Sequence, residues 1–266
     1  MDRPERGHGE RPRHFTTPKP DNKDVVFGVR AAIETIRAGK EIDRLLVQRE
    51  LGSSNTMAEL MQVAREANVP VQRVPVEKLD RITRKNHQGV IAFVSAIRYV
   101  SLHNVLSGAY EKGQTPLLLI LDRVTDVRNF GAIARTAECA GVHAIVIPAK
   151  GAAQINADAV KTSSGALNFI PVCRENSLRD TVIYLQESGV QVVACTEKAE
   201  KTIYQADYLA PTAIIMGSEE DGISDDLIRK ADVLAKIPMT GNIASLNVSV
   251  AAGVVIFEVT RQRLNA

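Results

Sequence analysis

The sequence predicts an α/β protein in which a smaller α/β domain precedes a C-terminal domain built on a parallel sheet. Short runs of Val, Ile and Leu alternate with segments of helical period from about residue 117 onward, which is typical of parallel strands joined by helices. The length of 266 residues suffices for one large or two modest domains. Aromatic residues make up 4% with no Trp, so we expect an aliphatic core and disfavour a platform that stacks single-stranded bases.

Residues 1–24 differ in composition from the rest of the chain. They hold four of the eleven prolines together with mixed charges, and Met1 and Phe15 are their only apolar anchors. Such a segment buries too little surface to offset the entropy of ordering. We therefore predict a disordered tail that ends near Val25.

Residues 25–96 are expected to form the small α/β domain. Val29, Ile33 and Ile36 recur at the spacing of one helix face. The following residues, 97–115, are weakly periodic and are punctuated by glycine, so we expect a linker there. The elements expected in the small domain are helices at 29–40 and 56–68 and strands at 44–48, 71–75 and 89–96.

Residues 116–266 are expected to form the parallel-sheet domain. No internal repeat is found, and each apolar run is short enough for a buried strand. The expected elements are strands at 117–121, 144–148, 169–173, 191–195, 213–216 and 234–238, and helices at 130–140, 157–163, 178–188, 225–231 and 246 to about 261.

The net charge differs between the two predicted domains. It is +4 over residues 25–100 and −3 over residues 101–266, within a total of +2. A basic N-terminal part makes a polyanion a candidate partner, although a charge of this size is also common in ordinary domains.

The cysteines and the apolar runs argue against several classes of protein. Cys139, Cys173 and Cys195 are widely spaced and contain no C-x-x-C pair, so they indicate neither a disulfide framework nor a metal site. The first residues lack the apolar core of a signal peptide, and no run approaches the roughly 18 apolar residues of a membrane helix. We therefore expect a cytoplasmic protein with no metal and no membrane contact.

The predicted domains lack the glycine motifs that bind dinucleotides or nucleotide phosphates and the motif of a serine nucleophile elbow. Three other segments follow predicted strands, at the edge where open parallel sheets bind their ligands. In the first, residues 126–135, Asn129 is expected to cap the next helix, and Gly131 and Arg135 share a face. A capped helix with a solvated arginine would show the same pattern.

The second segment, residues 214–222, places Gly217, Glu219 and Gly222 after a buried strand. Free backbone amides and a carboxylate would then stand at the sheet edge. The alternative interpretation is a solvated acidic turn.

The third segment, residues 237–249, leads into a helix that is apolar on nearly all sides. A buried helix of this kind needs a ligand or another chain as partner for its polar first turn. Ser245 is the expected N-cap, which leaves Asn247 free for another role.

Together the three segments resemble, in order, the three motifs of the SpoU (TrmH) family of ribose 2′-O-methyltransferases, in the SPOUT superfamily. The motif N-x-G-x-x-x-R matches Asn129, Gly131 and Arg135. The motif G-x-E-x-x-G matches the glycines and the glutamate of the second segment, and the third motif matches residues 237–249. One departure is Val127, where many members carry proline.

The resemblance implies that S-adenosyl-L-methionine binds in a deep trefoil knot of the C-terminal half. The cofactor would be held largely by backbone groups around Met216, Gly217, Ile237 and Leu246. In the family a second subunit completes the pocket, so the resemblance implies a homodimer. The basic domain resembles the RNA-recruiting domain of the RlmB-type subgroup, which methylates a guanosine ribose in large-subunit (23S) ribosomal RNA.

The resemblance also suggests roles for the polar residues. Arg135 would hold an RNA phosphate and stabilise the developing alkoxide, since a guanidinium with a pKa above ~12 is a poor base. Asn129 and Asn247 would orient Arg135 and the ribose, Glu219 would fix the arginine or a loop, and Ser245 would cap the last helix and contact the site. The alternatives are a ribose methyltransferase acting on tRNA and a non-catalytic RNA-binding protein with a vestigial site.

Overall fold

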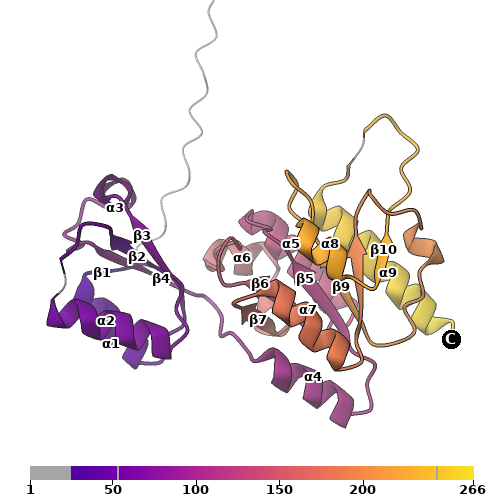
Figure 1. Ribbon diagram of the computed structural model, residues 1–266, viewed down its shortest axis with the longest axis horizontal. Coiled ribbons are helices and arrows are strands. Elements are labelled where there is room, and N and C mark those ends of the chain that lie inside the picture. Colours follow the sequence, from indigo (N-terminus) through magenta and orange to yellow (C-terminus); the bar gives the residue numbers. More distant parts are fainter. Residues whose placement is uncertain (1–24, 53, 244) are drawn as a thin grey trace, which may run out of the picture.

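The computed structural model describes residues 25–52, 54–243 and 245–266, which form two α/β domains, each with its own sheet (Figure 1). The predicted disordered tail, residues 1–24, lies outside the described residues. Within the described part, no helix is long and apolar enough to cross a membrane.

The N-terminal sheet is mixed and carries helices on both faces. Its strand order is β1-β4-β2-β3, with β2 and β3 parallel and the other two pairs antiparallel. Alternate residues of β2 enter different cores, because Leu45 packs with α1 and α2 whereas Leu46 packs with α3. The elements are β1 (Val25–Phe27), α1 (Val29–Arg37), β2 (Ile42–Gln48), α2 (Asn55–Glu66), β3 (Val71–Val74), α3 (Val76–Ile82) and β4 (Val90–Val94).

The C-terminal sheet has six strands in the order β10-β8-β9-β5-β6-β7, and every pair is parallel, which confirms the predicted parallel sheet. Its central strands are wholly buried, as expected for a sheet covered on both faces. The trefoil knot stays a prediction. The strands are β5 (Leu117–Leu121), β6 (Ala144–Pro148), β7 (Val172–Glu175), β8 (Gln191–Cys195), β9 (Thr212–Met216) and β10 (Val233–Ala235).

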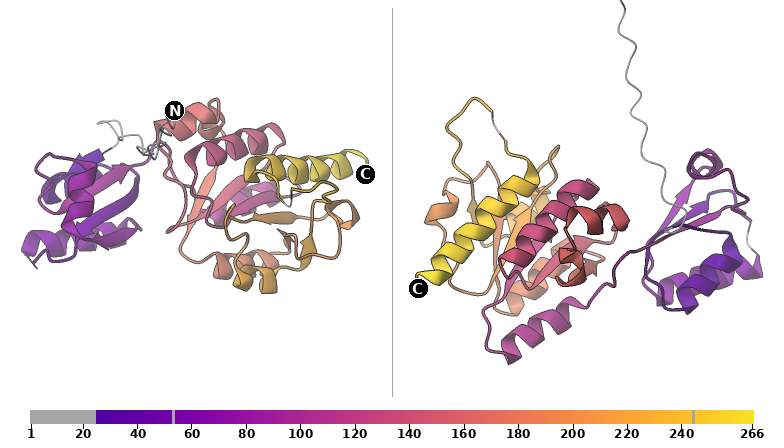
Figure 2. Two further views of the ribbon diagram at one scale, coloured as in Figure 1. Left: turned by 90° about the horizontal axis from the view of Figure 1, so that it is seen from above. Right: turned by 180° about the vertical axis from the view of Figure 1, so that it is seen from behind.

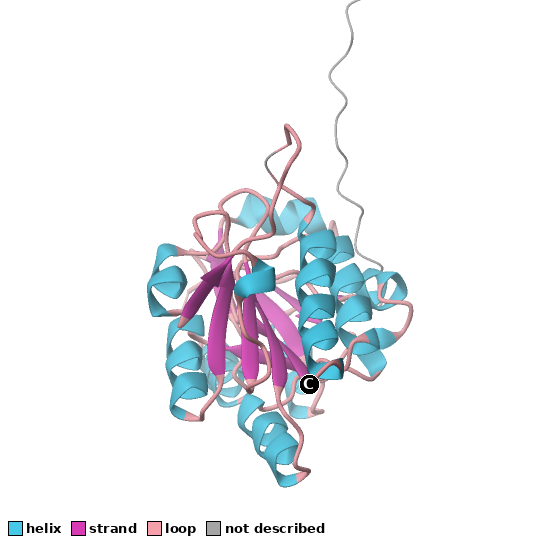
Figure 3. Ribbon diagram, turned by 90° about the vertical axis from the view of Figure 1, so that its right-hand side faces the viewer, coloured by secondary structure: helices cyan, strands magenta, loops and turns pink. Residues whose placement is uncertain are grey.

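Helices flank this sheet on both sides (Figure 3). One core contains α5 (Val127–Cys139), α6 (Ala157–Thr162) and α9 (Val248–Leu264), and α5 lies beside α9 (Figure 2). The other core contains α4 (Leu102–Glu111), α7 (Leu178–Glu187) and α8 (Asp225–Lys230). Short 3-10 turns lie at Ala166–Asn168 and Ile203–Gln205.

Several local predictions differ from the structure, since β1 and α3 are absent from the expected elements and the strand expected at 234–238 is the shorter β10. Two further differences have a clear physical reason. The segment predicted as an irregular linker, 97–115, contains α4, whose Leu102, Leu106 and Ala109 are buried at helical spacing against the sheet. The strand predicted at 169–173 begins instead at Val172, because a 3-10 turn precedes it and leaves Phe169 exposed.

Arg263 anchors the end of α9 to the loops that lead into β5 and β9. Its guanidinium donates hydrogen bonds to the carbonyl oxygens of Tyr208 (3.0 Å), Thr115 (2.9 Å), Pro116 (3.1 Å) and Ala210 (2.9 Å). Five donors in a rigid fork suit an arginine to this task.

We expect Arg263→Met to lower the free energy of unfolding by about 2 kcal/mol, because four carbonyls lose a charged donor. Urea denaturation measures the change. The control is Arg229→Met, which breaks one exposed ion pair with Asp226 and should cost less than about 0.5 kcal/mol. Equal losses for the two variants would contradict the anchoring role of Arg263.

Candidate active site

Polar side chains from the three strand-end segments meet at one edge of the parallel sheet. The Nδ2 of Asn129 donates to Oε1 of Glu219 at 2.8 Å. The Nδ2 of Asn247 donates to the same carboxylate oxygen at 2.7 Å and to Oδ1 of Asn129 at 3.0 Å. These three residues, the Asn–Glu–Asn cluster, therefore form one hydrogen-bonded unit from segments far apart in the chain.

A cavity of about 420 Å³ lies beside this cluster and is acidic. Its size is within the range of small-molecule sites. Asp126, Glu219, Glu220 and Asp221 line it, and the one cation among its lining residues is Arg123. The remaining lining residues are 124, 125, 129, 151, 218 and 248.

The side chain of Arg123 holds the second segment against the end of β5, a role that the motifs did not indicate. It donates to Asp122 Oδ1 (3.3 Å), Asp221 Oδ2 (3.1 Å) and the carbonyl of Gly222 (3.2 Å). The other oxygen of the buried Asp122 accepts from the amide of Ser224 at 2.7 Å. The available signal was an Asp-Arg pair placed directly after a buried strand.

Both predicted helix caps are wrong by a few residues. Helix α5 is capped by Asp126, whose carboxylate accepts from the amide of Asn129 at 2.8 Å. Helix α9 starts at Val248 and is capped by Asn247, and residues 245 and 246 lie outside the helix. Because Asp126 caps α5, the side chain of Asn129 is free to contact Glu219. Asn247 both caps α9 and takes part in the cluster.

Two motif glycines are required by close packing. A Cβ on Gly217 would lie 2.1 Å from the carbonyl carbon of Gly222, so the turn closes only over glycine. A Cβ on Gly131 would lie 2.8 Å from the carbonyl oxygen of Ala159, so this glycine lets α5 pack closely on α6. The close approach at Gly131 is therefore that of the backbone of α6.

Arg135 and Ser245 do not join the cluster. Arg135 is exposed on α5 and makes no hydrogen bond or ion pair within the described residues. Its neighbour Thr136 packs toward Gly253, where a Cβ would lie 3.5 Å from the threonine methyl. Arg135 therefore stands close to the line where α5 meets α9, and Ser245 is exposed in the loop before α9.

The loop after β10 fits a ligand that is held by backbone groups. From 237 to 246 the described residues make no hydrogen bond, so their amides and carbonyls are available. The side chains of Met239, Ile243 and Leu246 are exposed, Ile237 is half-buried, and Met216 is buried at the end of β9. This donor set suits the backbone-bound cofactor that the resemblance implies.

Two of the three cysteine thiols are shielded by burial, whereas Cys139 is exposed. Burial raises the pKa of the thiols of Cys173 and Cys195 to about 12, so both are protonated at neutral pH and are poor nucleophiles. Among the described residues, no group of three or more His, Cys, Asp or Glu side chains could hold a metal ion.

Comparisons with known proteins match both domains. The model of the SpoU rRNA Methylase family matches residues 116–257, and the model described as RNA 2′-O ribose methyltransferase substrate binding matches residues 25–100. The 23S rRNA (guanosine-2′-O-)-methyltransferase RlmB of Pseudomonas aeruginosa is 38% identical over 241 residues, 90% of this chain and 97% of the relative.

Solved structures show the same fold. The SpoU methyltransferase AviRb from Streptomyces viridochromogenes, in complex with AdoMet, has a TM-score of 0.57 and 26% identity over 91% of each chain. The TrmH/SpoU tRNA modifying enzyme of A. aeolicus has a TM-score of 0.53 and 29% identity, over 60% of this chain and 85% of that one.

The fold and the site define a two-domain protein in which a substrate-binding domain precedes a parallel-sheet domain with a polar site at its carboxyl edge. The chain belongs to the SpoU rRNA methylase family.

The hydrogen bond between Asn247 and Glu219 can be tested by exchanging its donor and its acceptor. Asn247→Asp keeps the oxygen that caps α9 at the amide of Ser249 but loses both amide donations and sets a second carboxylate beside Glu219. We expect a loss of about 1 kcal/mol in the free energy of unfolding. Adding Glu219→Gln should recover most of it, since the new amide can donate to the carboxylate introduced at position 247.

Urea denaturation of both single variants and the double variant gives the coupling energy. Asn247→Ala, which also removes the cap, should lose about 1 kcal/mol more than Asn247→Asp. Additive effects of the two substitutions would show that the side chains of residues 219 and 247 do not interact.

Proposed function

We propose that this protein transfers a methyl group from S-adenosylmethionine to a ribose 2′-hydroxyl of RNA, and that its substrate is a guanosine of large-subunit ribosomal RNA. The observation that carries the proposal is the Asn–Glu–Asn cluster, because it joins one residue from each of the three family motifs at the ligand-binding edge of the sheet. Family membership, the RlmB relative and the AdoMet-bound neighbour support it.

A ribosomal substrate is favoured over tRNA by the extent of the similarities. The RlmB relative matches along nearly its whole length, including the substrate-binding domain. The tRNA modifying enzyme matches over 60% of this chain. A vestigial site is disfavoured, since the motif residues are present and three of them are in contact. A ribosomal RNA substrate agrees with the predicted cytoplasmic location.

We propose that the cofactor binds at the backbone around four residues: Met216, Gly217, Ile237 and Leu246. When bound, S-adenosylmethionine supplies a methyl group on a cationic sulfonium, an electrophile that needs no metal to activate its leaving group. The free backbone groups of residues 237–243, 245 and 246 would bind it. The acidic cavity beside the cluster would favour its positive charge.

The polar residues would align the RNA and manage its charge. We assign to Arg135 the holding of a phosphate and the stabilisation of the negative charge that develops on the ribose oxygen. Water or an RNA phosphate would take the proton. Glu219 would fix Asn129 and Asn247 so that their remaining polar atoms face the ribose, and Ser245 would contact the substrate from the loop before α9.

We also propose a homodimer in which α9 meets a second copy of the chain. Val250, Phe257 and Leu264 are 53%, 50% and 80% exposed and recur every seven residues, so they form an apolar row on one side of the helix. This contrasts with the buried helix expected from the sequence. Because Arg135 stands near the line between α5 and α9, a second copy on this row would lie beside it and complete the site.

Finally, we propose that the functional boundaries are residues 25–96 for RNA binding, 97–115 for the connection and 116–266 for methyl transfer. The two family matches, 25–100 and 116–257, support this division.

The proposed function is tested by incubating the purified protein with unmodified 23S ribosomal RNA and tritium-labelled S-adenosylmethionine, followed by digestion to nucleosides. Label on the ribose of a guanosine is expected, and label on a base would contradict the proposal. We expect Arg135→Ala to lower the single-turnover rate by roughly 10² to 10³-fold with nearly unchanged cofactor affinity, and Arg135→Lys to recover little.

Arg179→Ala, which removes an exposed arginine from α7 on the opposite face of the sheet, is the matched control and should transfer methyl groups at the wild-type rate. Turnover of Arg135→Ala equal to that of the control would remove Arg135 from the site. Calorimetry with S-adenosylmethionine separates loss of cofactor binding from loss of the transfer step.

For the dimer, we expect Phe257→Asp to shift the protein from dimer to monomer in sedimentation equilibrium, because a charge would be buried against the partner. Methyl transfer should fall with it. The control is Tyr110→Asp on α4, which is 40% exposed on the opposite face of the sheet and should leave the mass unchanged. A wild-type protein that sediments as a monomer at micromolar concentration would contradict the proposed interface.

A further inference from the structure

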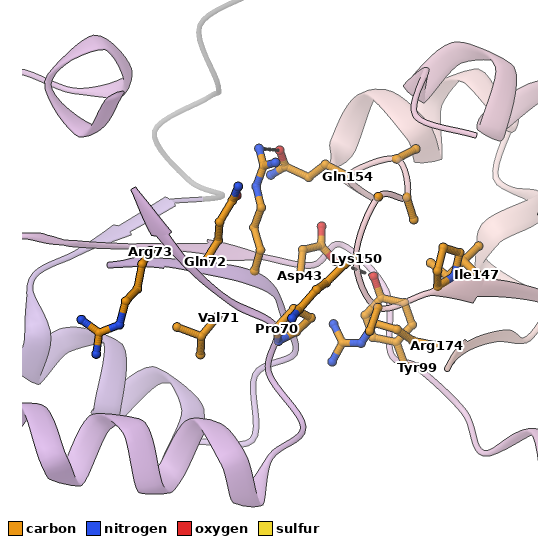
Figure 4. A pocket seen from close by; sticks show the side chains of 16 residues that line it. Asp43, Pro70, Val71, Gln72, Arg73, Tyr99, Ile147, Lys150, Gln154 and Arg174 are labelled. Atoms are coloured by element: carbon orange, nitrogen blue, oxygen red, sulfur yellow. Dashed lines mark hydrogen bonds between the residues drawn. The ribbon is translucent and has the colours of Figure 1, made fainter. Parts of the chain in front are cut away.

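A second cavity, of about 330 Å³, lies between the two domains (Figure 4). It is bordered by β3 and β7, which are edge strands of the N-terminal and the C-terminal sheet. Residues of β2 and β3 line one side, and the loop at 149–154 lines the other together with Arg174 of β7. We call this cavity the interdomain cleft.

The interdomain cleft is basic. Arg44, Arg73, Lys150 and Arg174 line it, against a single carboxylate, that of Asp43. Among the described residues, none of these four cations has a salt bridge within 4.0 Å. A concave surface with this excess of positive charge attracts a polyanion.

The carboxylate of Asp43 is already used to join the domains. It accepts hydrogen bonds from the hydroxyl of Tyr99 at 2.5 Å and from the amide of Ile155 at 3.0 Å. Burial raises the pKa of Asp43, so its charge is costly unless these donors stay in place.

Arg174 also fixes the domains relative to one another. Its guanidinium stacks 4.2 Å from the centre of the Tyr99 ring and donates to the carbonyls of Ile42 (2.7 Å) and Asn68 (3.2 Å), both in the N-terminal domain. Asp43, Tyr99 and Arg174 therefore hold the two walls of the cleft in place and leave the other cations for a ligand.

Lys150 and Arg44 approach the cleft from opposite domains. Lys150 is exposed, makes no hydrogen bond within the described residues and extends toward Pro70 (Figure 4). Arg44 lies over the Phe93 ring at 4.5 Å and has only a long hydrogen bond, of 3.4 Å, to Gln154. Arginine and lysine with unused donors are the usual contacts to phosphate oxygens.

The interdomain cleft adjoins the candidate active site. Gly151 lines both cavities, and the amide of Ala153 donates to the carbonyl of Val124 at 2.9 Å, which ties the loop between them to the segment before α5. An extended polyanionic chain bound in the cleft would therefore continue past Gly151 to the Asn–Glu–Asn cluster.

We propose that the interdomain cleft binds the sugar-phosphate backbone of the RNA next to the methylated nucleotide, with Lys150 and Arg44 donating to phosphate oxygens. This inference rests on the proposed function, since it takes RNA as the substrate. It adds that both domains grip one RNA segment and that their contact through Asp43 is part of the binding site.

The test measures binding of unmodified 23S ribosomal RNA, transcribed in vitro, to the full chain at several salt concentrations. We expect Lys150→Gln and Arg44→Gln each to weaken binding and to reduce the slope of log K against log salt by about 0.7 to 0.9, as for one lost phosphate contact. The matched control is Lys112→Gln, just after α4, which lines neither of the two cavities, and there neither quantity should change.

The outcomes separate the inference from the proposed function. If the wild-type protein methylates the RNA but the two cleft variants bind it like the Lys112 control, the inference is overturned and the function stands. If the wild-type protein neither binds nor methylates RNA, both fail. Calorimetry with S-adenosylmethionine should give wild-type affinity for all three variants, which shows that they are folded.

For Asp43→Ala, the charge of the cleft and the proposed role of the domain contact predict opposite changes in RNA affinity. Charge alone predicts tighter RNA binding, because a carboxylate is removed from a basic surface. The inference predicts weaker binding, because Tyr99 and Ile155 lose their shared acceptor and the walls of the cleft separate. Tighter or unchanged binding, in a variant that retains its cofactor affinity, would overturn the role given to the domain contact.

Discussion

The parallel direction of all six C-terminal strands is the constraint on which the site depends. Since parallel strands end at one edge of a sheet, the loops after β5, β9 and β10 meet there although their residues are far apart in the chain. Asn129 and Asn247 are 118 positions apart and are joined by a hydrogen bond. An antiparallel pairing of any of these strands would carry one member of the cluster to the opposite edge.

This constraint explains why so much of the fold could be predicted. Strands buried on both faces are continuous apolar runs, so Leu117–Leu121, Ala144–Pro148 and Gln191–Cys195 were predicted with the observed bounds. The helix caps were wrong because two suitable polar residues stand close together at each start. Local preference cannot choose between Asp126 and Asn129, or between Ser245 and Asn247, when the choice depends on what else each side chain contacts.

Features that depend on how separate elements pack were beyond the sequence patterns. The motifs placed Asn129 and Glu219 in neighbouring loops, but nothing local indicates that Arg123 holds the loop of Glu219 or that Gly131 is needed for contact with α6. The interdomain contact joins Asp43 to Ile155 across 112 positions and follows no spacing rule. The sequence patterns indicated which residues carry chemistry, and packing decides which of them meet.

The charges of the two cavities are opposite, and this bears on how one protein handles two unlike reactants. The cavity beside the cluster carries four carboxylates, and its one cation is paired with acids, so it suits a sulfonium better than a polyanion. RNA therefore needs positive charge elsewhere to approach this edge, and the interdomain cleft supplies it one loop away. Both domains contribute to the positive charge of the cleft, since Lys150 and Arg174 belong to the C-terminal domain although that domain is acidic overall. The two binding tasks are therefore divided between the two cavities and not between the two domains, and Gly151 lines both cavities.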